Sequence, residues 1–80
     1  MTVTVLLFAS WAERLGRSSI GLELPEGSTV SSVMQSVLSL PGASGMPPRP
    51  MVAVNRTYAR ADTVLANGDE VAIIPPVAGG

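Results

Sequence analysis

The sequence has 80 residues, of which 46% are hydrophobic and 14% charged, with a net charge of −1 and a pI of about 5.1. This composition excludes a disordered chain, offers no basic surface for nucleic acid, and contains no run near the ~20 apolar residues that span a membrane. The absence of Cys, His and Lys excludes disulfides, thiol or imidazole metal ligands, and the usual general bases and nucleophiles. We therefore predict one cytoplasmic domain over residues 1–80, without a catalytic site of its own side chains and without a tightly bound cofactor.

Two strands and a short helical turn are predicted in the first part of the chain. The β-branched run 2–8 has apolar side chains on both parities and indicates a strand covered on both faces. Residues 10–16 form the helical turn, with Ser10 as its cap and Gly16 at its end. A second strand, 19–25, can pair with the first strand as a hairpin.

One clear amphipathic helix follows these strands. Thr29 is predicted as its N-cap, and Pro41 and Gly42 end it. Its opposite face carries serines and a glutamine, which we interpret as a solvated surface. The apolar positions recur at helical spacing and predict one buried stripe. The stripe consists of Val30, Val33, Met34, Val37 and Leu38.

The rest of the chain predicts a loop and three more strands. Residues 41–50 are rich in Pro and Gly and predict a mobile loop. A short buried strand, 51–55, is followed by a brief return strand, 56–59. A turn around Asn67-Gly68 precedes the last strand, 70–75. A lone amphipathic helix must pack on the sheet, so the fold class is a two-layer α+β domain with the first and last strands in the middle.

Strand parity predicts a docking surface on the sheet face away from the helix. One parity, with Val5 and Ile73 among its members, faces the helix. The other parity leaves apolar side chains facing outward, and such a patch on a small domain usually marks a partner site. The outward set consists of Leu6, Phe8, Ala72 and Ile74, joined by Tyr58 from the return strand.

The C-terminal segment 75–80 is predicted to be a flexible tail that carries the function. Without Cys the chain cannot carry sulfur on a side chain, and if it carries an acyl group or sulfur, the only special group is the α-carboxylate of Gly80. Gly79 and Gly80 have no Cβ, which allows a narrow partner channel to accept the backbone. Pro75 and Pro76 favour an extended geometry, and six residues reach roughly 20 Å.

Three stretches resemble the sulfur-carrier small subunits of molybdopterin synthase, which have a ubiquitin-like β-grasp fold. "LLFASWAERLG" (6–16) is similar to the opening strand of that family and its Phe-Ala-x-x-x-Glu-x-x-Gly turn. "LPEGSTVSSVM" (24–34) is similar to the start of its helix. "AVN" (53–55) and "GDEVAIIPPVAGG" (68–80) resemble its closing segment. Ala12 departs from the pattern, since many relatives carry Arg there.

The resemblance implies a reaction cycle and its partners. A ubiquitin-activating-like adenylyltransferase would use ATP to adenylate Gly80, and a sulfur donor protein would convert the adenylate to a thiocarboxylate. The loaded tail would enter the large subunit, which supplies the catalytic lysine, and give sulfur to cyclic pyranopterin monophosphate. The assembly would be a heterotetramer. Partner contacts are expected at Phe8, Tyr58, Ile74, Pro75, Pro76, Val77 and Gly79.

Three alternatives remain open at the level of sequence. The chain could be a sulfur carrier for thiamin or cysteine synthesis, a protein modifier attached to target lysines, or an interaction module with an inert Gly-Gly. ATP-dependent adenylation of the tail separates the first two from the inert module. The final acceptor separates a carrier from a modifier.

Overall fold

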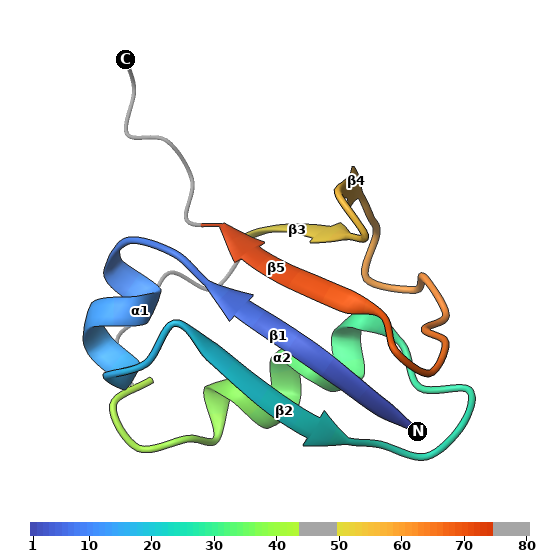
Figure 1. The fold of residues 1–80 in the computed structure, drawn as a ribbon, viewed down its shortest axis with the longest axis horizontal. Helices are drawn as coiled ribbons and strands as arrows, with labels where there is room; N and C mark the ends of the chain where they lie inside the picture. Colours follow the sequence, from blue (N-terminus) through green and yellow to red (C-terminus); the bar gives the residue numbers. More distant parts are fainter. Residues whose placement is uncertain (44–49, 75–80) are drawn as a thin grey trace.

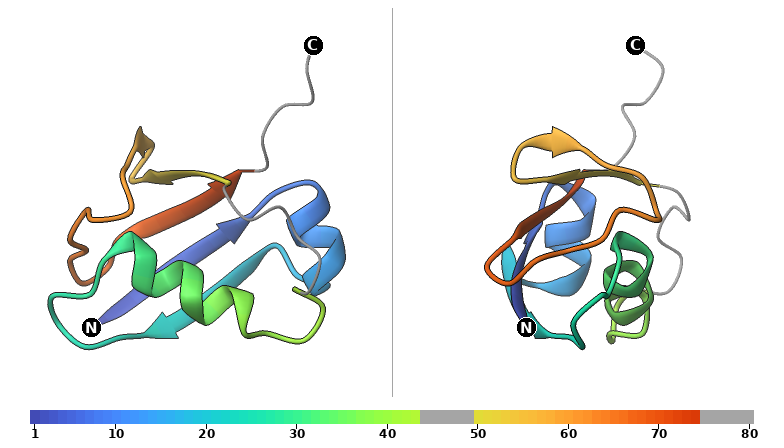
Figure 2. Two further views of the ribbon diagram at one scale, coloured as in Figure 1. Left: turned by 180° about the vertical axis from the view of Figure 1, so that it is seen from behind. Right: turned by 90° about the vertical axis from the view of Figure 1, so that its right-hand side faces the viewer.

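A five-stranded mixed sheet with a helix across its back forms the framework (Figures 1 and 2). The structure is a computed structural model, and it describes residues 1–43 and 50–74. The predicted order of strands and helices is confirmed, and the observed elements are slightly shorter than predicted. They are β1 (Thr2–Leu7), α1 (Ser10–Leu15), β2 (Ser19–Glu23), α2 (Val30–Leu38), β3 (Met51–Val54), β4 (Thr57–Tyr58) and β5 (Glu70–Ile74).

The strands lie in the order β2-β1-β5-β3-β4, so β1 and β5 are interior strands, as predicted. β1 pairs antiparallel with β2 as a hairpin and parallel with β5. In the parallel pair, Leu7 lies beside Ile73. Both strands therefore end at the same end of the sheet, next to α1 (Figure 1).

The core lies between the sheet and α2, which lies across one face of the sheet and is nearest the viewer in the left view of Figure 2. The predicted assignment of alternate strand side chains to the helix-facing side is confirmed, because Val5, Val71 and Ile73 are fully buried. The helix stripe is narrower than predicted. Met34 is half-buried, and Leu38, in the last turn, is 43% exposed because it lies on the flank of the helix. The buried residues of α2 are Val30, Val33 and Val37.

The short helix α1 buries Trp11 completely, which the sequence interpretation did not anticipate. Ser10 was predicted as the cap of this helix, and that prediction is wrong. The N-cap is Ala9, at φ 49° and ψ −123°, and Ser10 is the first helical residue. The reason is a tight turn closed by the Trp11 N–H, which donates to the Phe8 carbonyl at 3.1 Å. Gly16 ends the helix in the left-handed conformation, as predicted.

The segment after α2 returns to the end of α1. Gly42 lies there at φ +91°, and a Cβ at this position would be 2.6 Å from the carbonyl oxygen of Arg14. The next residue, Ala43, is buried. Only a glycine therefore fits this close approach between backbones. The rest of the predicted mobile loop, 44–49, lies outside the described residues.

The N-terminus of α2 has its backbone donors satisfied. Thr29 is the N-cap, as predicted, and its N–H donates to Ser32 Oγ at 3.1 Å. The N–H groups of Val30 and Ser31 donate to carbonyl oxygens of the turn at residues 60–63, at 3.0 and 2.9 Å. Such donors are unpaired in an isolated helix, so this turn replaces solvent at the start of α2.

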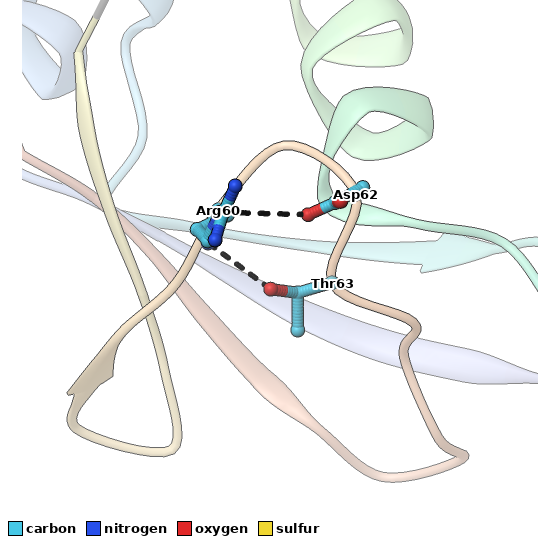
Figure 3. A network of polar contacts seen from close by, with 3 residues as sticks. All are labelled: Arg60, Asp62 and Thr63. Carbon is cyan, nitrogen blue, oxygen red and sulfur yellow. Dashed lines mark hydrogen bonds and ion pairs between the residues drawn. The ribbon is translucent and has the colours of Figure 1, made fainter.

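The turn that faces the N-terminus of α2 is closed by its own polar groups (Figure 3). The Arg60 N–H donates to Thr63 Oγ1 at 3.0 Å, and Arg60 Nε lies 3.9 Å from Asp62 Oδ1. Both charged side chains are highly exposed, so the ion pair contributes little to stability. In the part of the chain that the structure describes, no helix is long and apolar enough to cross a membrane.

Candidate docking surface

The outward residues of the central strands form one hollow of about 470 Å³ on the sheet face away from α2. All five residues predicted for the docking surface line it: Leu6, Phe8, Tyr58, Ala72 and Ile74. Three further residues complete the lining: Ala53, Arg56 and Glu70. We call this set the outer hollow. Parity alone found its centre, because β1 and β5 are neighbours and place alternate side chains on one face.

Two aromatic side chains stand out from this surface. Phe8 is 46% exposed and Tyr58 is 69% exposed, whereas Leu6 and Ile74 are half-buried. The hollow therefore has an aliphatic floor and aromatic walls. Exposed aromatic groups beside an apolar depression are characteristic of surfaces that bind another protein.

Phe8 is held by the turn that precedes α1. Ala9 has a positive φ with ψ −123°, a conformation that glycine adopts far more readily than alanine. The hydrogen bond from the Trp11 N–H to the Phe8 carbonyl closes this turn, and the buried Trp11 anchors it in the core. Phe8 directly follows β1, so the strand before it and the turn after it together fix its position.

Tyr58 is carried by the β3–β4 hairpin. Val54 pairs with Thr57, which leaves Asn55 and Arg56 as the two-residue turn. Both have positive φ, 50° and 71°, as a type I′ turn requires. Asn55 joins this turn to β5: its N–H donates to the Glu70 carbonyl at 2.8 Å, and its Oδ1 accepts from the Glu70 N–H at 3.0 Å.

The carboxylate of Asp69 also holds the β3–β4 turn, through a contact with Asn55. Its Oδ2 accepts from the Ala66 N–H at 2.8 Å, and its Oδ1 accepts from Asn55 Nδ2 at 2.9 Å. These bonds favour the ionised carboxylate, so the Ala66 N–H first and the Asn55 amide second lower the pKa of Asp69 below its usual value. The hairpin that carries Tyr58 is therefore attached to the sheet partly through a charged group.

This attachment predicts a pH dependence of stability. Because the pKa of Asp69 is lower in the folded chain, its contribution is present above the ordinary Asp pKa of about 3.9 and is lost as the pH falls through the folded value. We expect Asp69→Asn to lower the thermal midpoint by a few degrees at pH 7 and to reduce its further fall between neutral and acidic pH. Thermal unfolding of the unsubstituted chain and of Asp69→Asn, between neutral and acidic pH, measures the effect. Parallel curves would contradict the assigned role of Asp69.

The predicted tail residues Pro75, Pro76, Val77, Gly79 and Gly80 lie outside the described residues. The residue that precedes them in the chain is described. Ile74, the last residue of β5, lines the outer hollow and pairs with Met51 of β3. In the sequence, the tail therefore follows directly after a residue that lines the outer hollow.

A second groove of about 520 Å³ lies between α2 and the β3–β4 hairpin. Met34, Met51 and Tyr58 are among its lining residues, so Tyr58 borders both depressions. Sequence reasoning missed this groove, because it depends on how the hairpin sits beside the helix. Among the described residues, no three Asp or Glu side chains are grouped so as to hold a metal ion.

The chain matches the ThiS family over residues 5–80. It is 34% identical over 79 residues to the molybdopterin synthase sulfur carrier subunit of Arabidopsis thaliana, with 98% of this chain and 82% of that relative covered. The crystal structure of SAMP1 from Haloferax volcanii has a TM-score of 0.85 and 25% identity, with both chains fully covered. A TM-score of 0.74, with 20% identity and full coverage of both chains, is found for a structure described as the protein–protein complex of subunits 1 and 2 of molybdopterin-converting factor from Helicobacter pylori. These likenesses confirm the predicted ubiquitin-like β-grasp fold.

Proposed function

This chain belongs to the ThiS family, and we propose on that basis that it is the sulfur-carrier subunit of a molybdopterin synthase, with the α-carboxylate of Gly80 as the sulfur-bearing group. The observation that carries the proposal is the family match, which extends through the Gly79-Gly80 end of the sequence. The identity to a sulfur carrier subunit of molybdopterin synthase supports the choice of pathway. The absence of Cys supports the choice of group, because no side chain can form a persulfide.

The proposed chemistry occurs in three steps at one carbon atom. An adenylyltransferase joins the Gly80 carboxylate to the α-phosphate of ATP, with release of pyrophosphate. A sulfur donor, equivalent to hydrosulfide, then displaces AMP: the C–S bond forms as the C–O bond to phosphate breaks. In the large subunit, the thiocarboxylate sulfur then bonds to a carbon of cyclic pyranopterin monophosphate and displaces an oxygen substituent there. Water cleaves the acyl C–S bond, which restores the Gly80 carboxylate and leaves the sulfur on the product. This chain contributes the carbonyl group and its delivery, while the partners contribute the catalytic side chains and the nucleotide.

The outer hollow is the proposed contact with the large subunit. Its aromatic walls are exposed in the isolated chain, and the tail follows directly after Ile74, which lines the hollow. A protein seated on the hollow would therefore receive the tail directly. The complex of subunits 1 and 2 in the Helicobacter pylori relative supports a large subunit as the occupant.

We expect Phe8→Asp and Ile74→Asp to weaken large-subunit binding at least tenfold, on the order of 1.4 kcal/mol or more, because each places a charge in a desolvated apolar contact. Phe8→Asp should leave the thermal midpoint nearly unchanged, since Phe8 is already half-exposed. Isothermal titration of each variant against the large subunit measures the effect. The matched control is Val64→Asp, which alters an apolar side chain that is 66% exposed and outside the outer hollow. Undiminished binding by both hollow variants would refute this contact.

The sulfur-carrier role itself is tested by the mass of the chain. We expect co-expression with the adenylyltransferase and sulfur donor to produce a species in which one oxygen is replaced by sulfur, and fragmentation to place the change at Gly80. Omission of ATP in a reconstituted reaction should abolish the species. A chain whose mass never changes under these conditions would contradict the proposal.

A second candidate function is a protein modifier, which the likeness to SAMP1 favours, since a Haloferax volcanii relative is described as small archaeal modifier protein 1. Both functions require adenylation of Gly80 and differ in the acceptor. Transfer to a protein lysine would leave an isopeptide bond, whereas a sulfur carrier for molybdopterin, thiamin or cysteine synthesis would leave the chain unattached and its product sulfurated. The acceptor found in a reconstituted reaction separates them.

A further inference from the structure

All three non-glycine residues with positive φ in the described part of the chain adjoin the outer hollow. Ala9 follows Phe8, while Asn55 and Arg56 form the turn that carries Tyr58. Unusual backbone conformations in non-glycine residues cluster at binding and catalytic sites, where the surrounding structure holds them in place. The positions of these three residues therefore point to the outer hollow as a binding site.

Arg56 is the least expected of the three residues. Asn55 tolerates the left-handed conformation, but the second position of a type I′ turn is most often glycine. Arg56 adopts φ 71° with a long side chain, is exposed, and lines the outer hollow. Glycine at this position would form the same turn without the steric cost.

The turn is held firmly enough to keep Arg56 in this conformation. Asn55 makes three hydrogen bonds to β5 and the residue before it, at 2.8, 3.0 and 2.9 Å. The guanidinium has no carboxylate within ion-pairing distance among the described residues, although Glu70 lines the same hollow. It therefore forms the one cationic group among the residues that line the outer hollow, and a carboxylate on the protein seated there could pair with it.

We propose that Arg56 is a specificity-determining residue that pairs with a carboxylate on the large subunit, held in place by a turn that would be more stable with glycine. This inference rests on the proposed function, because the large subunit is its partner. A planar, permanently charged guanidinium suits such a pair better than an ammonium group. A charge at the rim also acts mainly on the association rate and its salt dependence, which gives it a distinct experimental signature.

The test is binding of the full chain to the large subunit encoded in the same genome, measured at low and high salt. We expect Arg56→Gln to weaken binding about tenfold at low salt and to reduce the salt dependence. The matched control Arg60→Gln removes the same charge from a turn outside the hollow, where Arg60 faces Asp62, and should bind as the unsubstituted chain does (Figure 3). Arg56→Lys should recover part of the loss.

Arg56→Gly supplies a second, independent readout. It should raise the thermal midpoint by a few degrees while weakening the complex, since it relieves the left-handed conformation and removes the charge together. If Arg56→Gln and Arg56→Gly bind as tightly as the unsubstituted chain with the same salt dependence, the pairing is refuted while the proposed function stands. If the unsubstituted chain does not bind the large subunit at all, the proposed function fails, and this inference with it.

Discussion

Removal of Gly80 should abolish sulfur transfer and leave the thermal midpoint nearly unchanged. The reacting carboxylate would then end one residue, about 3.5 Å, short of the position where the adenylyltransferase and the large subunit act on it. The fold should not respond, because Gly80 has no side chain to pack, and terminal residues contribute little to stability unless they are tied down. Single-turnover sulfur transfer and thermal unfolding of the same sample measure the two effects.

A second variant tests for obstruction of the partner channel at unchanged chain length. Gly79→Val keeps the chain length and adds a branched side chain next to the reacting group, so it should also impair transfer, by obstruction in the partner channel. Full activity without Gly80 would contradict the carrier function. A large loss of stability would instead show that the terminal residues take part in the fold.

Gly42→Ala should be the most destabilising of the conservative substitutions considered for this chain. A Cβ would lie 2.6 Å from the Arg14 carbonyl oxygen, and the φ of +91° is unfavourable for alanine. The left-handed conformation costs about 1–2 kcal/mol and overpacking against backbone about 1–3 kcal/mol. We expect a loss of about 3 kcal/mol, which lowers the thermal midpoint of a domain this small by about 12–24 °C.

The matched control for this substitution is Gly27→Ala. Gly27 has φ +86°, close to that of Gly42, but a Cβ there meets nothing within 4 Å. It should cost only the conformational part, about 1–2 kcal/mol. Equal losses from the two substitutions in urea unfolding would show that the approach of Gly42 to α1 relaxes without penalty.

The order of the strands and the lone amphipathic helix predicted the α+β fold class, and strand parity predicted the centre of the outer hollow. The alternation of Val5, Leu6 and Leu7 assigns each side chain to a face before any pairing is known, because the strand period is two. The same holds for Ala72 and Ile74 in β5. The helix N-cap at Thr29 was also predicted, since it depends on neighbouring residues alone.

Features that depend on distant parts of the chain were not predicted. Trp11 lies in a six-residue helix whose direction is set by the turn at Ala9, and an alanine does not indicate the positive φ that this turn requires. A pair of apolar residues four apart, Trp11 and Leu15, was the available signal for a buried face of this helix. The turn at Asn55 and Arg56 was not predicted, because the Asn-Arg sequence lacks the glycine by which such hairpins are recognised.

The parallel pairing of β1 with β5 also determines how the domain can fold. Thr4 pairs with Glu70, so the central ladder joins strands from opposite ends of the sequence, and such high contact order slows folding. The β1–β2 hairpin can form early, but one edge of β1 then stays unpaired until β5 arrives. Open edges of this kind template aggregation. We therefore expect the refolding yield to fall as protein concentration rises, and nascent chains that lack β5 to require chaperones.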